Sequence, residues 1–275
     1  MNFWDAYLVS SSVVFSMMTA LWACSLLIKD ASIVDRVWGL GFVLIAWTLA
    51  CMTPMLDLGR LLMVIMVSIW GLRLSFYIHF RNQGHPEDYR YAAMRKFHGK
   101  RFWWYSFFSV FTLQAVIMLV VAMPVIWTLS RTNETAPPNF VIAATLIWFI
   151  GFIFEAGGDW QLKRFKSDAS NRGKLLNTGF WRWTRHPNYF GDALQWWAFG
   201  ALATAYGSKA LPTLIGPAVM TLFLRKVSGV DLLEKTMRNS KPGYEDYVKT
   251  VPAFLPKWQF WVALAIASAL VMVLI

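Results

Sequence analysis

The sequence predicts an all-α fold, a polytopic bundle of seven or eight helices that span a membrane. Hydrophobic residues make up 57% of the 275 residues, and charged residues make up only 15%. A soluble domain usually carries about 25% charged residues. Several apolar windows also reach the roughly 18–20 residues that a helix needs to cross the hydrocarbon core of a bilayer.

Eight apolar segments are candidate spans. The first lacks a basic start and a small-residue cleavage site, so we expect a retained helix rather than a cleaved signal. The sixth and seventh are short or are interrupted by Gly207, Pro212 and the pair 216–217, which is why the count is seven or eight. The candidate spans are residues 7–28, 37–53, 60–80, 104–129, 139–162, 190–206, 210–226 and 258–275.

Basic residues are concentrated in every second connecting segment. Segments 29–36, 81–102, 163–188 and 225–257 hold 2, 6, 7 and 7 lysines and arginines, or 22 of the 26 in the chain. This alternation is the positive-inside pattern, which predicts four cytoplasmic segments and an N-terminus outside. It also accounts for the net charge of +11 without nucleic acid as a partner. We expect one integral membrane domain over residues 1–275.

The last basic segment contains signals for two short helices. Apolar residues between 230 and 237 recur at helical spacing and predict an amphipathic helix, which the Lys-Pro-Gly sequence at 241–243 ends. A second short helix is expected to begin at Tyr244. Both cysteines, Cys24 and Cys51, lie in predicted spans, so we expect neither a disulfide framework nor a thiolate metal site.

Ionisable residues at membrane depth are costly and therefore point to function. Glu155 and Asp159 are four residues apart in the fifth predicted span and share one helical face, which Gly157 and Gly158 leave bare. Glu155 is the deepest carboxylate, and Arg73 in the third span is a possible structural partner for it.

Asp35 begins the second predicted span at the same cytoplasmic side. An aspartate at this position acts either as a helix cap or as a catalytic group near the substrate. Both interpretations remain open from the sequence.

The segment 175–192, LLNTGFWRWTRHPNYFGD, is the most informative part of the chain. It places cations, a tyrosine hydroxyl, an amide and a carboxylate directly before a long apolar run. Guanidinium groups bind phosphate oxygens through paired hydrogen bonds. The pattern therefore predicts a site for an anionic cofactor at the membrane edge, where an apolar substrate can arrive through the lipid.

This segment resembles the signature of the membrane sterol reductases, and the chain as a whole resembles the bacterial steroid 5-alpha-reductase-like branch, much of it a domain of unknown function (DUF1295). The resemblance covers residues 150–275 well and residues 30–100 more loosely. The matching signature residues are Leu175, Leu176, Thr178, Gly179, Phe180, Trp181, Arg185, His186, Asn188, Tyr189, Gly191 and Asp192.

The resemblance implies NADPH-dependent reduction of a carbon–carbon double bond in a lipid-soluble, steroid- or isoprenoid-like substrate. It implies a cofactor-binding portion over residues 150–257, which lacks the GxGxxG motif of a Rossmann domain. The expected cofactor-binding residues are Asp159, Lys166, Arg182, Arg185, His186, Asn188, Tyr189, Asp192, Tyr244 and Tyr247.

Reduction of a double bond also needs a proton donor beside the hydride. Glu155 and Tyr189 are the main candidates, and Asp35 is a weaker one. His186 is either a proton donor or a structural cap before Pro187. The Gln-Glu dipeptide of the 5-alpha-reductases is absent from the sequence, so a 3-keto steroid substrate is not implied.

Two other function classes remain open. Isoprenylcysteine and phospholipid methyltransferases, which use S-adenosylmethionine, share the Arg185-His186-Pro187 sequence and a later acidic helix, to which Glu234 corresponds. Asn188 and Asp192 favour the reductase over the methyltransferase. A non-enzymatic lipid-binding or assembly factor would account for the interfacial tryptophans and cations, but not for the polar signature.

Overall fold

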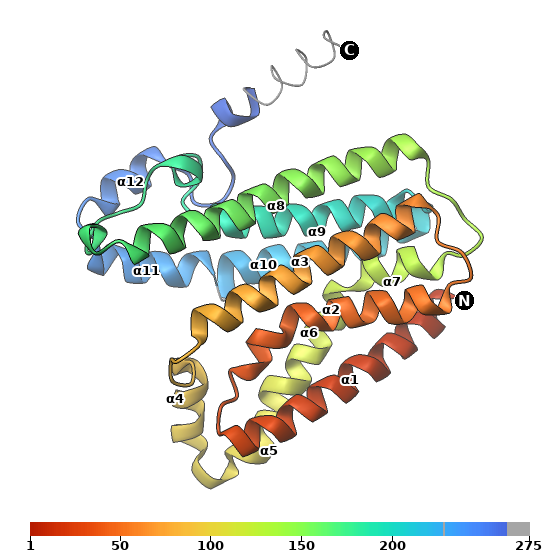
Figure 1. Cartoon of the computed structure of the whole chain (residues 1–275), viewed down its shortest axis with the longest axis horizontal. Helices are drawn as coiled ribbons and strands as arrows, with labels where there is room; N and C mark the ends of the chain where they lie inside the picture. The colour runs from red at the N-terminus through yellow and green to blue at the C-terminus, as the bar shows by residue number, and fades with distance from the viewer. Residues whose placement is uncertain (228, 263–275) are drawn as a thin grey trace. The chain divides into compact units, whose positions relative to one another are not determined.

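The computed structural model describes residues 1–227 and 229–262, and within these ranges the secondary structure is helical, without a β-strand (Figure 1). The predicted all-α class is therefore confirmed. Of the predicted terminal span 258–275, only residues 258–262 are described, and they are helical. The rest of that prediction lies outside the described residues.

Five helical stretches in the described ranges are long and apolar enough to cross a membrane. The predicted count of seven or eight spans is not reached by this criterion. The five stretches are α1 (Phe3–Ile28), α2 (Ile33–Met52), α3 (Leu58–Asn82), the composite Tyr89–Val121 and α8 (Pro138–Ser167).

The predicted span 104–129 is not one regular helix. A break at Ala122 separates its two main parts, because Pro124 lies in the first turn of the following helix and has no N–H to continue the previous one. A π-helical segment also widens the turns between Phe107 and Thr112. The components are α4 (Tyr89–His98), a 3₁₀ turn (Gly99–Arg101), α5 (Phe102–Ser106), the π segment, α6 (Leu113–Val121) and α7 (Met123–Ser130).

Glycine and proline interrupt the later apolar segments, as predicted. The helix α9 (Pro187–Thr204) is followed by Gly207, whose positive φ of 112° ends the helical path. A 3₁₀ segment that contains Pro212 then leads into α10 (Ile215–Leu222) and a π-helical turn (Phe223–Val227).

The two short helices of the last basic segment are confirmed as α11 (Val230–Ser240) and α12 (Tyr244–Thr250). Gly243, at the start of α12, has the positive φ that this tight connection requires. The free cysteines Cys24 and Cys51 are both exposed.

The chain divides into two compact units, which we describe separately. Unit 1 consists of residues 1–145 and 199–217, and its core is built around α2 and α3. These two helices approach closely where Gly39 faces Gly71, since a Cβ added to Gly39 would lie 2.5 Å from the Gly71 carbonyl oxygen.

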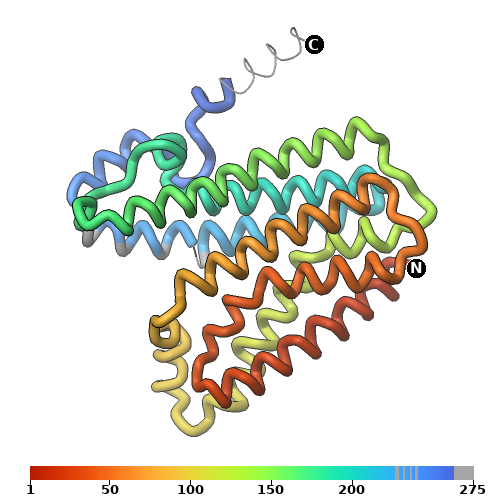
Figure 2. Tube along the Cα trace, in the orientation of Figure 1, coloured from red at the N-terminus to blue at the C-terminus, as the bar shows by residue number. Residues whose placement is uncertain are grey.

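Unit 2 consists of residues 146–198 and the chain from Ala218 onward. In Figure 2 its trace runs from the green of α8 to the cyan of α9 and then to the blue of α11 and α12. The signature segment lies in this unit: residues 175–186 connect α8 to α9, and residues 187–192 form the start of α9.

Candidate functional site

The first part of the signature, residues 175–186, forms a short connection with little regular structure. Gly179 has a φ of 59° and begins a 3₁₀ turn (Gly179–Arg182). Pro187 is the first residue of α9, a position where its fixed φ suits the helix and its missing N–H has no cost. The Gln161 side chain of α8 holds this connection from the other side, because it donates to the Thr178 carbonyl and accepts from the Phe180 N–H.

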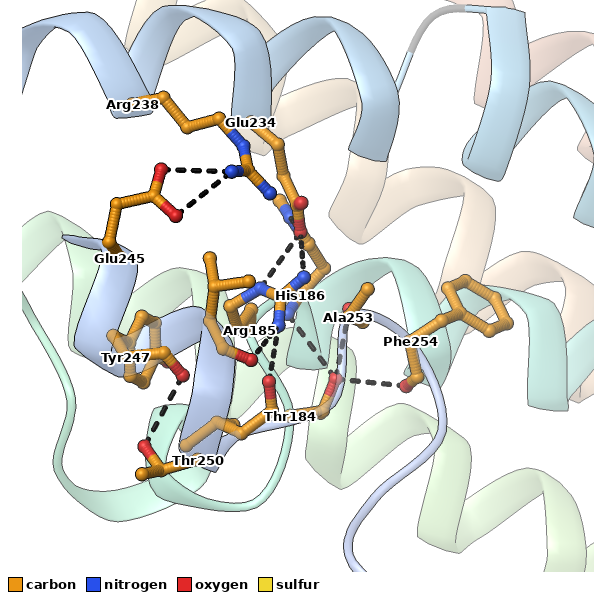
Figure 3. A network of polar contacts seen from close by, with 12 residues as sticks. Thr184, Arg185, His186, Glu234, Arg238, Glu245, Tyr247, Thr250, Ala253 and Phe254 are labelled. Carbon is orange, nitrogen blue, oxygen red and sulfur yellow. Dashed lines mark hydrogen bonds and ion pairs between the residues drawn. The ribbon is translucent and has the colours of Figure 1, made fainter.

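A buried ion pair holds α11 against this connection (Figure 3). The guanidinium of Arg185 donates to Glu234 Oε1 from Nε at 2.9 Å, and its Nη2 lies 2.7 Å from the same oxygen. His186 Nε2 lies 3.3 Å from that oxygen. Burial favours the neutral form of the Glu234 carboxyl, but hydrogen bonds from His186 and Arg185 and the charge of Arg185 lower its pKa below the ordinary value.

Arg185 also holds the end of α12. Its Nη1 donates to the carbonyl oxygens of Val248 and Val251, and its backbone N–H donates to the Pro252 carbonyl at 2.9 Å. The side chain is only 7% exposed. Its hydrogen-bond donors are therefore directed at protein acceptors, so this residue organises the site from within.

The chain after α12 is fastened to the signature by further hydrogen bonds. Tyr247 donates its hydroxyl hydrogen to the Trp181 carbonyl, and Thr184 donates to the Phe254 carbonyl at 2.9 Å. The Lys257 N–H donates to the Trp183 carbonyl at 2.9 Å. Burial raises the pKa of the Tyr247 hydroxyl, which keeps it a neutral donor. The C-terminal segment thus sets the path of the signature.

Two carboxylate–amide pairs connect α8 and α9 inside unit 2. Asn188 Nδ2 donates to Asp159 Oδ1 at 2.9 Å, and Gln195 Nε2 donates to Glu155 Oε2 at 2.6 Å. Asp159, Glu155 and Gln195 are 4%, 3% and 0% exposed. Asn188 and Gln195 are seven residues apart, which is about two helical turns and places both on one face of α9.

Glycines bring the two helices close enough for these pairs to form. A Cβ added to Gly151 would lie 2.7 Å from the Gly191 carbonyl oxygen, and one added to Gly191 would collide with the backbone of Glu155. Phe180 packs on Gly157, and Pro187 packs on Gly158. The bare surface expected around Glu155 and Asp159 is therefore filled in part by the signature itself.

The other predicted cofactor residues lie in the same unit. Tyr189 is partly buried and stacks on His186, with ring centroids 5.7 Å apart. Asp192 and Tyr244 are buried. Arg182 is exposed and lies over the Trp183 ring, and Lys166 is exposed in the last turn of α8.

Exposed cations surround this connection, in contrast to the buried Arg185. These side chains are accessible to an anionic ligand, whereas the buried face between α8 and α9 carries carboxylates and amides. The exposed cations of the segment are Lys163, Arg164, Lys166, Arg172, Lys174 and Arg182.

Asp35 belongs to unit 1, where it holds α4. Its two carboxylate oxygens accept from the Tyr91 hydroxyl and from Arg90 Nη2, both at 2.9 Å. Arg90 is also bound by Asp88, the N-cap of α4. The contacts of Asp35 are those of a residue that fixes a neighbouring helix.

Two residues that contact predicted site residues, Gln195 and Glu234, were not among the residues predicted for the site. Gln195 was not predicted at all, although its spacing of seven from Asn188 on the same helix is a signal that could have identified it. Glu234 entered only through the methyltransferase resemblance, and its contact with Arg185 spans 49 residues of sequence. No group of three potential metal ligands occurs among the described residues.

A separate hollow of about 500 Å³ lies on the C-terminal segment of unit 2. It is lined by residues 248–252 and 255–259, including Lys249, Lys257 and Trp258. None of the predicted site residues lines it.

Comparison with known proteins places the chain in a family. The family described as protein of unknown function (DUF1295) matches residues 21–251. The chain belongs to this family. An uncharacterised protein of the yeast Schizosaccharomyces pombe, C594.04c, is 26% identical over 304 positions, which cover 94% of this chain and 83% of that protein.

A second relative is named for an enzymatic activity. Delta(14)-sterol reductase erg24 of the same yeast is 34% identical over 80 positions, which cover 24% of this chain and only 19% of that protein. No solved structure matches the chain significantly.

Proposed function

We propose that this protein is a membrane-embedded, NADPH-dependent reductase that delivers hydride to a carbon–carbon double bond of a lipid-soluble, steroid- or isoprenoid-like substrate. The observation that carries the proposal is the pairing of two buried carboxylate–amide contacts with a rim of exposed cations in one unit. The similarity to a sterol reductase, which is partial, agrees with it.

The polar groups of unit 2 suit the different parts of the cofactor. Exposed Lys166 and Arg182 match the phosphates, because cations bind phosphate oxygens through charge-assisted hydrogen bonds. Asp159 and Asn188 offer acceptors for ribose hydroxyls, and the Asn188 Oδ1 atom is buried without a donor among the described residues. The remaining predicted residues support those that contact the cofactor and hold the signature in place. They are Arg185, His186, Asp192, Tyr244 and Tyr247.

When bound, NADPH supplies the hydride, and the chain must supply a proton and exclude water. Glu155 and Tyr189 are the candidate donors, since Glu155 is buried at membrane depth and Tyr189 lies at the start of α9. Gln195 donates to Glu155 Oε2, so a proton on this carboxyl is favoured on the other oxygen.

The proposed setting follows from the charge distribution. The basic segments that contain the cations face the cytoplasm, where the cofactor is available, and the N-terminus lies outside. A hydrophobic substrate enters from the bilayer. By this proposal the protein resides in a bacterial inner membrane.

Methyl transfer from S-adenosylmethionine is the second candidate. It is favoured by one observation, the contact of Glu234 with Arg185 and His186, because this joins the Arg-His-Pro sequence to an acidic helix. Methyl transfer does not require the two carboxylate–amide pairs between α8 and α9. We therefore rank it below reduction.

Ligand-dependent stability separates the two functions. Purified protein in detergent is heated with NADPH, NADH or S-adenosylmethionine, because a ligand that binds only the native state raises the unfolding temperature. We expect stabilisation by NADPH, which Asp159→Asn reduces and the exposed Asp168→Asn leaves unchanged. Stabilisation by S-adenosylmethionine alone would overturn the reductase. Incubation with a panel of unsaturated sterols and isoprenoids then tests for the gain of two hydrogen atoms by mass spectrometry.

A further inference from the structure

Gln195 is a buried amide that the expected cofactor contacts do not use. It lies on α9 at 0% exposure, one turn beyond Gly191. Its Nε2 atom donates to Glu155 Oε2 at 2.6 Å and to the Gly191 carbonyl oxygen at 3.3 Å. Both hydrogens of the amide nitrogen are therefore directed at acceptors.

These two acceptors determine which way the amide faces. If the side chain were flipped, its carbonyl oxygen would meet the Gly191 carbonyl oxygen, which has no hydrogen to donate, and Glu155 Oε2, which could donate only if the carboxyl carried its proton on that oxygen. The orientation with Nε2 toward Glu155 is thus the favourable one. It leaves Oε1 buried, and no donor among the described residues reaches this atom.

An unpaired carbonyl oxygen inside a protein destabilises the fold, and a lipid environment offers no water to relieve that cost. Apolar side chains of similar size would avoid it altogether. A glutamine at this position is explained if a ligand brings a hydrogen-bond donor to Oε1.

The position of Gln195 Oε1 indicates which part of a ligand could donate to it. Glu155, the partner of Gln195, lies about 16 Å along α8 from Lys166, a distance set by the helical rise. Phosphates belong at the rim of exposed cations. The part of a nicotinamide cofactor that suits membrane depth is its uncharged dihydronicotinamide ring, whose carboxamide carries two N–H donors.

We propose that Gln195 Oε1 accepts a hydrogen bond from the nicotinamide carboxamide, an inference that rests on the proposed NADPH-dependent function. Gln195 then joins two groups, since its nitrogen holds the Glu155 carboxyl and its oxygen holds the ring. It is a positioning residue that sets the distance between the proton donor and the hydride donor, and it selects nucleotides that carry a carboxamide.

Two oxidised nucleotides that differ in a single group test this contact. NADP⁺ carries a carboxamide, whereas its 3-acetylpyridine analogue carries a methyl ketone and so lacks the N–H while it keeps the carbonyl. Each is titrated against bound NADPH in the full-length protein, and displacement is followed by nucleotide fluorescence. The wild-type protein is expected to bind NADP⁺ about tenfold more tightly, the effect of roughly one hydrogen bond.

The variant Gln195→Met, which keeps the length of the side chain and removes the amide, should bind both nucleotides with similar affinity. The matched control Gln83→Met, at an exposed amide in unit 1, should keep the tenfold preference. Equal affinities in the wild-type protein overturn the inference even if the variant fails to fold. A preference that survives in Gln195→Met overturns it as well. If no nicotinamide nucleotide binds, the proposed function itself fails.

Discussion

The Arg185 guanidinium and the Glu234 carboxylate form a buried ion pair, with Nη2 and Oε1 2.7 Å apart and side chains that are 7% and 13% exposed. The pair connects the signature to α11. The same arginine donates to backbone carbonyls at the C-terminal end of α12, so a single side chain holds three segments of unit 2 together.

Loss of this arginine should destabilise the protein strongly. Arg185→Gln leaves the Glu234 carboxylate, whose side chain is only 13% exposed, without its main partner, a change that costs up to about 3–5 kcal/mol, the range for fully buried pairs. Thermal unfolding in detergent measures the effect. The control is Arg238→Gln, because Arg238 and Glu245 are 44% and 59% exposed and such a pair contributes about 0–1 kcal/mol. Equal losses in the two variants would contradict the structural role.

The contribution of Glu234 should disappear in acid. Its partners lower the folded-state pKa below the ordinary value of 4.5, so the stabilisation is present in full above about pH 4.5 and is lost as the pH falls through the folded pKa. The unfolding temperatures of wild type and Glu234→Gln should therefore converge as the pH is lowered from about 4.5. A gap that stays constant over this range would show that ionisation of Glu234 is not the cause.

Tyr247 should act through the fold. Tyr247→Phe removes the hydroxyl that donates to the Trp181 carbonyl and leaves a buried acceptor unpaired, at a cost of about 1–3 kcal/mol. Unfolding measurements should detect this loss, and the exposed Tyr89→Phe should show none. Weaker nucleotide binding with unchanged stability would instead assign Tyr247 a direct contact with the ligand.

The close approach of α8 and α9 should tolerate no methyl group at Gly191. Gly191→Ala places a Cβ against the backbone of Glu155 and Gly151, and overpacking of this kind costs about 1–3 kcal/mol. It should also weaken nucleotide binding, because the Glu155–Gln195 contact depends on this spacing. Gly158→Ala is the graded control, since its nearest contact, Pro187 Cγ, lies at 3.1 Å. A larger effect at Gly158 than at Gly191 would refute the prediction.

Asp35 should be needed for the position of α4. Asp35→Asn weakens the contacts with Arg90 and Tyr91, so hydrogen exchange over residues 89–98 should become faster. Once a substrate is known, any loss of reductase activity in Asp35→Asn should be accounted for by the loss of folded protein. Loss of activity with unchanged hydrogen exchange over residues 89–98 would instead support Asp35 as a catalytic residue.

The class of the protein and its local helices were predictable from the sequence, because hydropathy, charge alternation and helix-ending residues act over short distances. The helices α11 and α12 followed from apolar spacing and one Lys-Pro-Gly sequence. The division of the span 104–129 was not foreseen, although Pro124 was visible, because hydropathy averages over a single break.

The signature and the place of Glu155 within a long apolar helix were likewise predictable from the sequence, since both depend on residue type and spacing. The tertiary structure decided the partners. Asp159 meets Asn188 across 29 residues, Glu155 meets Gln195 across 40, and Arg185 meets Glu234 across 49. Helical periodicity identifies the face on which a side chain lies, but only the packing of helices, here permitted by Gly151 and Gly191, determines which faces touch.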